Sequence, residues 1–242
     1  MTLILNSAEI KECVQFNAEL IPIIEDAFKS LSLGKTVMPP ILRLDIEKYH
    51  GESDVKAAYI EGLDSFAVKV ASGFFNNPKL GLPSSNGLMI LLDSQTGVIK
   101  SVLLDKGYLT DVRTAIAGAI ASKYLSNPES STVAIIGTGI QARMQLEALT
   151  LVRDIKNVNV WSRDIKKTHA YIEDVSKNNN LNFITFDNTK EVVNNADILI
   201  TTTPSKKPLV DYSYLPKGIH ITAMGSDAEE KNELEPRSEE RR

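Results

Sequence analysis

The segment 132–142 contains the residues that most directly indicate a chemical function. A run of apolar residues, 133–136, ends in Gly137-Thr-Gly139-Ile-Gln-Ala142 and leads directly into a helical pattern. Gly137 would permit a tight turn, Gly139 would let a phosphate approach the backbone, and Ala142 would let the helix pack close to the strand. A pyrophosphate would then lie on the free N–H groups at the start of the helix. The candidate cofactor-binding residues of this segment are Gly137, Gly139, Ile140, Gln141 and Ala142.

The residues after the next predicted strand, 158–162, bear on the choice of cofactor. NAD sites usually carry an acidic residue there, whereas an arginine accommodates the 2′-phosphate of NADP. Ser162 and Arg163 occupy this place, so the sequence favours NADP. Asp164 is better placed to cap the following helix, but it leaves NAD open as the alternative.

Three charged residues could act on a substrate, and each also has a simpler explanation. Lys69 is the lone charge in an apolar strand pattern, which is typical of a lysine that protects a sheet edge. Arg113 falls in the first turn of a helical pattern, where it could clamp a carboxylate beside free N–H groups or simply be solvated. Asp227 follows a predicted strand, where aspartate is often only a loop cap.

Composition and charge exclude several classes of protein. A chain of 242 residues with 43% hydrophobic and 24% charged residues fits a globular protein of two modest domains. Its net charge of −4 leaves no basic surface for nucleic acid. No apolar run reaches transmembrane length and the N-terminus lacks a basic signal region, so we predict a cytoplasmic protein. The three histidines lack metal-ligand spacing, and the single cysteine, Cys13, is expected to be a small buried thiol.

The first predicted domain, residues 1–126, combines helices with an antiparallel sheet in an α+β arrangement. A helix capped by Ser7 is expected to run to Gly34. A second helix is expected to start at a Thr110 cap, with Val112, Ile116, Ala119, Ile120 and Tyr124 as its buried stripe. Strands are expected after the prolines of 38–45 and at 55–60, 66–71, 88–93 and 98–104, the last two joined by a hairpin turn at 94–97.

The second predicted domain, residues 127–228, has the pattern of a Rossmann-type, doubly wound α/β domain. Five strands are expected, at 133–136, 158–162, 181–186, 197–203 and 220–225. Ligands of such sheets bind beyond the carboxyl ends of the strands, which brings Thr202, Thr203 and Asp227 toward a cofactor. Residues 228–242 include ten charged residues in fifteen, so the segment 229–242 is predicted to be a disordered tail.

Taken together, several motifs resemble the ornithine cyclodeaminase/mu-crystallin family over about residues 20–236. They are Lys69, the segments 81–88, 109–118 and 136–142, and Met224-Gly-Ser-Asp227 with Lys231 and Glu233-Leu. Within the family, the segments 38–43 and 72–83 look most like the ectoine-utilisation branch.

The resemblance implies roles for residues in both predicted domains. Arg43, Lys69 and Arg113 would gather around a substrate carboxylate, and Asp227 would be the acid/base beside the nicotinamide. Thr110 would join the cofactor-binding residues, and homodimers would form through the first domain. The substrate would be an amino acid or its cyclic imine, converted by deamination with cyclisation or by ketimine reduction.

Two departures from the family pattern leave alternatives open. Lys56 stands near the place where ornithine cyclodeaminases carry a glutamate for the substrate amine, and Ser162 aligns with their NAD-binding aspartate. Family members also continue with a segment that adds a sixth strand, so the resemblance implies a C-terminally truncated chain. A non-catalytic NADP-binding protein like mu-crystallin, or an inactive remnant, is therefore the alternative to an enzyme.

Overall fold

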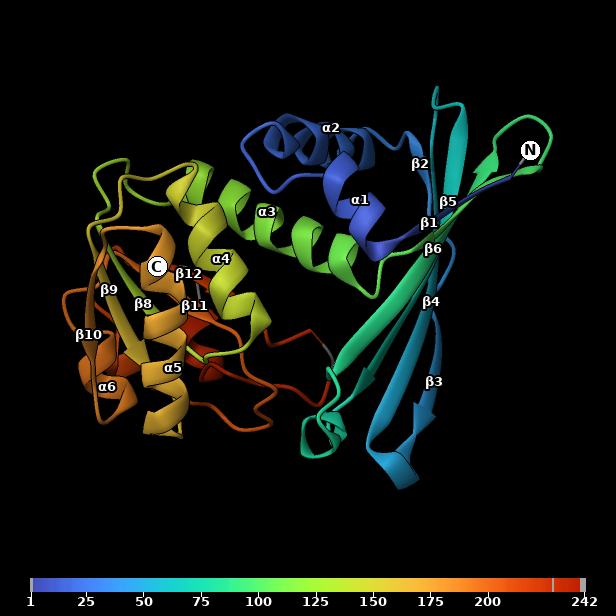
Figure 1. The fold of residues 1–242 in the computed structure, drawn as a ribbon. Helices are drawn as coiled ribbons and strands as arrows, with labels where there is room; N and C mark the ends of the chain where they lie inside the picture. The colour runs from blue at the N-terminus through green and yellow to red at the C-terminus, as the bar shows by residue number, and fades with distance from the viewer. Residues whose placement is uncertain (1, 228, 240–242) are drawn as a thin grey trace. The chain divides into compact units, whose positions relative to one another are not determined.

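The computed structural model describes residues 2–227 and 229–239, and it divides into two compact units, Met1–Arg113 and Thr114–Arg242. The division falls inside the helix α3 (Tyr108–Leu125), earlier in the chain than the expected boundary after residue 126. Each unit has its own sheet, as the expected α/β organisation requires (Figure 1).

The first unit is built on a seven-stranded mixed sheet. Six strands follow the order β1-β7-β6-β5-β4-β2, and β3 pairs with β4. All pairs are antiparallel except the parallel pair of β1 with β7. The strands are β1 (Leu3–Asn6), β2 (Thr36–Val37), β3 (Leu42–Ile46), β4 (Gly51–Ile60), β5 (Ser65–Phe74), β6 (Ser85–Asp93) and β7 (Ile99–Leu104).

The register gives this sheet one charged and one apolar face. Because side chains alternate along a strand, Arg43 shares a face with its partner Asp54, and Lys56 on that face is opposite Lys69. The other face carries apolar side chains that are each more than a third exposed. They include Ile4, Leu42, Leu44, Ile46 and Leu104.

The N-terminal helical region differs from the single helix expected over 7–33. It consists of α1 (Ser7–Cys13) and α2 (Leu20–Ser32), which lie on the same side of the sheet (Figure 1). The cap of α1 is Asn6 rather than Ser7, because the Asn6 side chain accepts hydrogen bonds from the N–H groups of residues 8 and 9 while Glu9 accepts from the Asn6 N–H. Cys13 ends α1 and is exposed, so the expectation of a buried thiol is wrong.

The helix α3 also starts differently from the expectation. It begins at Tyr108, so Thr110 lies within its first turn and is not the cap. The capping hydrogen bonds come instead from Asp105, whose carboxylate accepts from the Gly107 and Leu109 N–H groups at 3.2 and 2.8 Å. Of the expected stripe, Val112, Ile116, Ala119 and Ile120 are buried, whereas Tyr124 is exposed.

The second unit contains a five-stranded, fully parallel sheet in the order β10-β9-β8-β11-β12. The order reverses beside β8, as in a doubly wound dinucleotide-binding fold, and the five expected strands are confirmed. The strands are β8 (Thr132–Ile136), β9 (Asn157–Trp161), β10 (Asn182–Thr185), β11 (Ile198–Thr201) and β12 (His220–Ala223).

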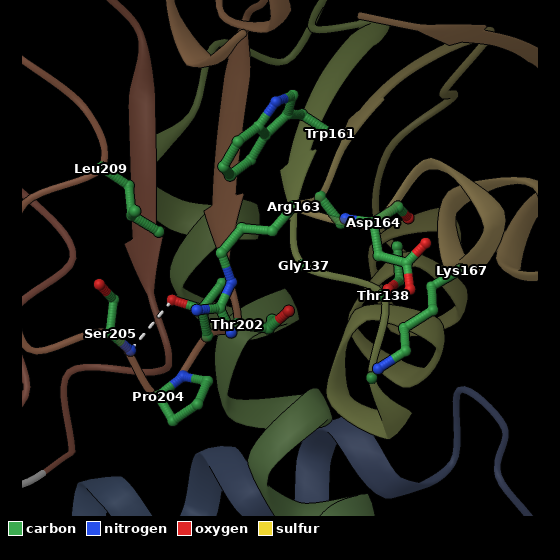
Figure 2. Close-up of a pocket in the computed structure, with 13 residues that line it drawn as sticks. Gly137, Thr138, Trp161, Arg163, Asp164, Lys167, Thr202, Pro204, Ser205 and Leu209 are labelled. Atoms are coloured by element: carbon green, nitrogen blue, oxygen red, sulfur yellow. Dashed lines mark hydrogen bonds between the residues drawn. The ribbon is translucent and has the colours of Figure 1, made fainter. Parts of the chain in front are cut away.

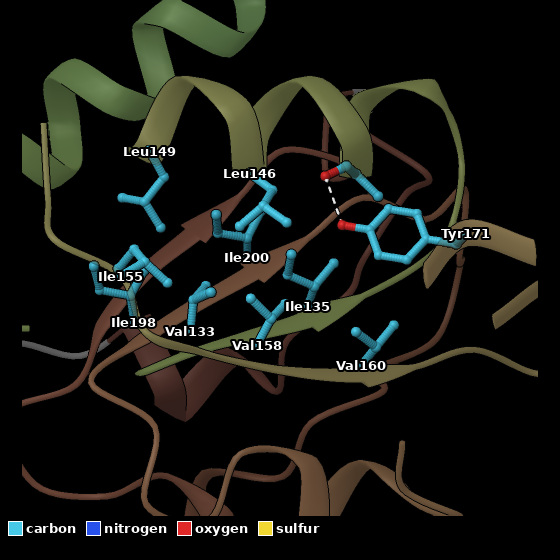
Figure 3. Close-up of a cluster of buried hydrophobic side chains, with 11 residues drawn as sticks. Val133, Ile135, Leu146, Leu149, Ile155, Val158, Val160, Tyr171, Ile198 and Ile200 are labelled. Carbon is cyan, nitrogen blue, oxygen red and sulfur yellow. Dashed lines mark hydrogen bonds between the residues drawn. The ribbon is translucent and has the colours of Figure 1, made fainter. Parts of the chain in front are cut away.

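Both faces of this sheet are covered. One face packs against α4 (Ile140–Thr150) and α5 (Ile165–Val175), where Leu146, Leu149 and Tyr171 meet Val133, Ile135 and other strand residues (Figure 3). The opposite face packs against α6 (Thr189–Val192) and the segments around Val210 and Leu234. Strands buried on both faces must be apolar on both, which explains the continuous run at 133–136.

The charged segment after Asp227 is partly packed, which corrects the expected disorder for residues 229–239. Glu233 and Leu234 are buried, and Leu234 pairs with Val210 in a parallel β-bridge. Leu234 thereby enters the core on the second face of the sheet. Residues 240–242 of the expected tail lie outside the described part of the chain.

In the part of the chain that the structure describes, no helix is both long and apolar enough to cross a membrane.

Candidate functional site

A cavity of about 340 Å³ lies beyond the carboxyl ends of β8, β9 and β11 in the second unit (Figure 2). This is where open parallel sheets bind their ligands, and the volume is within the range of small-molecule sites. Its lining residues are Gly137, Thr138, Gly139, Trp161, Ser162, Arg163, Asp164, Lys167, Thr202, Thr203, Pro204, Ser205 and Leu209. The structure therefore brings together six of the predicted cofactor-binding residues.

Each of the two positions in the turn is a glycine for a different structural reason. Gly137 has φ +115°, and a Cβ there would lie 2.5 Å from Thr202 Oγ1, so a side chain is excluded by conformation and by contact. Gly139 has no neighbour within 4 Å of the position of an added Cβ. The space beside Gly139 is thus open, and its role in binding a phosphate stays a prediction.

The side chain of Arg143 braces this turn, a contact that the motif does not reveal. Its Nη1 donates to the carbonyl oxygens of Thr138 and Gly139 at 2.6 and 3.0 Å. Its Nε donates to Asp174 on α5 at 2.8 Å. Because the carbonyls are held by an arginine on α4, the N–H side of the turn can face the cavity.

The remaining residues of the predicted motif lie on α4. Ile140 is exposed in the first turn, Gln141 is half-buried, and Ala142 is fully buried against Tyr171, whose hydroxyl donates to the Ala142 carbonyl at 3.2 Å. A small residue at 142 is therefore needed for packing. Thr110 belongs to the first unit and is not among the residues that line the cavity.

Two cations and one acid surround the end of the cavity that follows β9. Arg163 and Lys167 both line it, and Figure 2 shows the Arg163 side chain extending into it. Asp164 caps α5 as expected, because its carboxylate accepts from the Lys166 N–H at 3.0 Å. The Ser162 hydroxyl is engaged with the Asp164 carbonyl and with Thr168 Oγ1, both at 2.9 Å.

A second group of charged residues gathers in the first unit on the charged face of the sheet. Arg43 donates to Asp45 at 2.9 Å and to Glu52 at 2.8 Å. Lys56 is 3.1 Å from Asp54 Oδ2, while the other oxygen of this carboxylate is buried and has no hydrogen-bond partner in the described structure. A buried oxygen without a hydrogen-bond partner destabilises the folded protein unless a ligand donates a hydrogen bond to it.

Lys69 lies at the centre of this face and not at an edge. The strand β5 is between β4 and β6, with Lys69 directly opposite Lys56 and Met89. The edge-lysine explanation is therefore wrong. Burial, followed by the like charges of Arg113 and Lys56, lowers the pKa of Lys69 from 10.5 to about 8.

Asp227 is exposed and its Oδ1 accepts a hydrogen bond from Lys231 at 2.8 Å. The Lys231 side chain is largely buried, so the ion pair holds the loop after β12. No group of three or more His, Cys, Asp or Glu side chains within residues 2–227 and 229–239 could hold a metal ion.

The parallel sheet, the open Gly-x-Gly turn and the cavity at the strand ends define a dinucleotide-binding protein of the Rossmann class. The sequence profile of the ornithine cyclodeaminase/mu-crystallin family matches residues 1–240. The chain belongs to this family.

Known proteins resemble the chain over nearly its whole length. An uncharacterized cyclodeaminase of Sinorhizobium fredii is 50% identical, with 96% of this chain and 71% of the relative covered. The Δ1-pyrroline-2-carboxylate reductase of Thermococcus litoralis, solved with NADH and L-proline, is 31% identical with a TM-score of 0.92, covering 98% of this chain and 73% of that chain. An archaeal alanine dehydrogenase dimer with bound NAD is 34% identical with a TM-score of 0.89, covering 98% and 71%. The family to which the chain belongs therefore includes NAD(P)-dependent enzymes of the cyclodeaminase, imine reductase and dehydrogenase type.

Proposed function

We propose that the protein is an NAD(P)-dependent enzyme acting on an amino acid or its cyclic imine. The observation that carries this proposal is the mixed-charge cluster around Lys69, in which one buried carboxylate oxygen of Asp54 has no hydrogen-bond partner in the described structure. A zwitterionic amino acid, or an imino acid with a protonated nitrogen, would satisfy both signs of charge at once. The dinucleotide cavity supplies the second requirement of such a reaction.

In this proposal the residues of the first unit bind the substrate. Lys69 and Arg113 hold the α-carboxylate of the substrate. Arg43 is already paired with Asp45 and Glu52, and it orients these two carboxylates beside the substrate. Asp54 Oδ1 accepts a hydrogen bond from the substrate nitrogen. These contacts place the substrate's α-carbon, and positioning of this kind supplies much of the rate enhancement in hydride-transfer enzymes.

The residues of the second unit hold the cofactor and move the proton. Bound NAD(P) would supply the hydride acceptor or donor. The Gly137–Gly139 turn and the start of α4 take the pyrophosphate, and Thr202 and Thr203 face the cavity beyond β11. Asp227 transfers the proton that accompanies formation or reduction of the C=N bond, with Lys231 orienting its carboxylate.

The charges on the sheet also bear on the substrate side chain. Lys56 faces Lys69 across the strand pair, so a distal ammonium group entering beside them would meet two like charges. We therefore propose substrates with neutral or acidic side chains in place of ornithine. A role in ectoine catabolism rests on the resemblance of segments 38–43 and 72–83, and a cytoplasmic location rests on the sequence prediction.

The cofactor end of the cavity favours NADPH over NADH in this proposal. Arg163 and Lys167 provide two cations against the single Asp164, which suits a dianionic 2′-phosphate.

Arg163→Ala should weaken NADPH binding by about tenfold, because one charge-assisted contact is lost, and it should leave NADH binding nearly unchanged. The chain has one tryptophan, Trp161, which lines the cavity, so quenching of its fluorescence measures both affinities. Lys166→Ala is the matched control, because Lys166 lies three residues later in the first turn of α5 and is not among the lining residues. Equal affinities in the unmodified protein would contradict the preference.

Homodimer formation is proposed through the apolar face of the first sheet. The exposed side chains of this face include Leu42, Leu44 and Ile46, and an uncovered patch of this kind marks an interface.

Leu44→Glu should convert the protein to monomers in analytical ultracentrifugation, because it buries a charge in the contact between the two subunits. Leu63→Glu, at an exposed leucine in the turn between β4 and β5, should remain dimeric. A monomeric unmodified protein would refute the proposed interface.

The competing proposal is a non-catalytic NADP-binding protein like mu-crystallin. The two are separated by incubating the protein with NADPH and a cyclic ketimine carboxylate, and in parallel with pyruvate and ammonia, while absorbance of the reduced nicotinamide is followed. Consumption of NADPH with either substrate supports the enzyme. Tight NADPH binding without consumption of either supports the binding protein.

A further inference from the structure

Glu233 presents a buried carboxylate that the proposed chemistry does not use. Its side chain is fully buried, and its two oxygens accept four hydrogen bonds. Oε1 accepts from the N–H and the hydroxyl of Thr203 at 2.6 and 2.7 Å. Oε2 accepts from the Thr201 hydroxyl and from the Gly225 N–H, both at 2.8 Å. Within the described residues no cation pairs with it, so these four donors alone compensate its burial.

The donors come from the ends of two adjacent strands. Thr201 ends β11, and Thr203 follows it at the wall of the cofactor cavity. Gly225 lies just after β12, two residues before Asp227. The backbone N–H of Glu233 also donates to the Ser226 hydroxyl at 3.1 Å. One side chain thus links the turn that faces the cofactor to the loop that carries the proposed acid/base.

The packing around Gly225 shows that the space is shaped for this carboxylate. A Cβ at Gly225 would overlap the Thr203 carbonyl oxygen and would lie 2.6 Å from the Glu233 carboxyl carbon. The glycine therefore lets the backbone approach closely enough to donate to Oε2. Neither the turn nor the loop could keep this distance with a larger residue at 225.

We propose that Glu233 is a positioning residue. It fixes the position of the cavity-facing turn after β11 relative to the loop that bears Asp227. Glu233 does not itself line the cavity, and it acts through Thr203, which does, and through Gly225, two residues before Asp227. The assignment of Asp227 as acid/base rests on the proposed function, whereas the geometric link does not.

The arrangement requires a carboxylate and not merely a polar side chain of the same shape. Each oxygen receives one backbone N–H, which cannot rotate away, and one hydroxyl, which can. A glutamine in either orientation would place its NH₂ group against one of the two backbone N–H groups. Glu233→Gln should therefore break one strand-end contact, although it preserves volume and hydrogen-bonding capacity.

The test compares Glu233→Gln with the unmodified protein and with Glu235→Gln. Glu235 lies two residues later in the same segment and accepts a hydrogen bond from the Tyr212 N–H, away from the cavity. Binding of NADPH is followed by Trp161 quenching at a temperature where all three proteins are folded. Amide hydrogen exchange of Thr203 and Gly225 is measured without cofactor. Glu233→Gln should bind NADPH at least about tenfold more weakly and exchange one of these amides faster, because a buried donor is left unpaired. Glu235→Gln should match the unmodified protein in both.

A Glu233→Gln variant that only loses thermal stability, with unchanged NADPH affinity and unchanged exchange at both amides, would overturn the proposal. If that variant does not fold, Thr201→Val takes its place, because it removes one hydroxyl donor and should give smaller changes of the same kind. Failure of the unmodified protein to turn over any substrate would refute the proposed function alone, since binding and exchange still report on Glu233. Failure to bind either nicotinamide cofactor would overturn both.

Discussion

Asp227→Asn should lower turnover by about 10²- to 10⁴-fold, the usual contribution of a positioned general acid or base. The substitution keeps the shape of the side chain and a hydrogen-bond acceptor for Lys231, but it removes the group that takes up and releases the proton. Because Asp227 does not line the cavity, NADPH affinity should stay within about twofold of the unmodified protein. Steady-state kinetics and Trp161 quenching measure the two quantities separately.

The control for Asp227→Asn is Asp154→Asn. Asp154 is also an exposed aspartate that pairs with a nearby lysine, Lys156, in the second unit, but it is not part of the cavity lining. This variant should keep full turnover. If Asp227→Asn were equally active, Asp227 would have only the role of a loop residue held by Lys231.

Lys69→Met should weaken substrate binding by about 10- to 100-fold, because a charge-assisted contact to the carboxylate is lost. The same change should raise the melting temperature, since it replaces a partly buried cation that faces two like charges. Lys35→Met, at an exposed lysine after α2, should change neither property. If the variant were more stable but its substrate KM were unchanged, Lys69 would have a role only in the structure of the sheet and would not bind the substrate.

The lowered pKa of Lys69 predicts two opposite effects of pH. Substrate KM should rise as the pH passes through about 8, because Lys69 then loses the charge that holds the carboxylate. Between about pH 8 and 10.5 the unfolded chain binds this proton and the folded chain does not, so the contribution of Lys69 to stability becomes more favourable with rising pH. Both effects should be absent from Lys69→Met. A KM without a step near pH 8 would mean that the charge of Lys69 does not reach the substrate.

Local patterns predicted the strands and the first turn of the second unit well. The strands of the second unit are buried on both faces and the turn between β8 and α4 has a steric need for glycine at 137, so their sequence is constrained residue by residue. The cap at Asp164 also follows from local geometry. These features depend on neighbours within a few residues, which is why the sequence alone reveals them.

Predictions made from the charge pattern were wrong where the burial of a residue depends on distant parts of the chain. Lys69 looks like an edge residue from its own strand, but β4 and β6 on either side place it at the centre of a sheet. The tail after Asp227 looks disordered from its ten charges, yet donors at the ends of β11 and β12 satisfy Glu233, and Val210 pairs with Leu234. A charged residue can be buried when the fold brings enough donors to it, and local composition does not record those donors.

The sequence by itself thus determined the α/β class, the five parallel strands and the Gly-x-Gly turn beside the cavity, because periodicity and glycine sterics are local properties. Only the tertiary structure decided which charges share a face with Lys69, and that one buried Asp54 oxygen there has no hydrogen-bond partner in the described residues. It also decided that Glu233 joins two strand ends that lie far from it in sequence. Strand register and burial set these relations, and both arise from contacts between segments that the chain brings together only on folding.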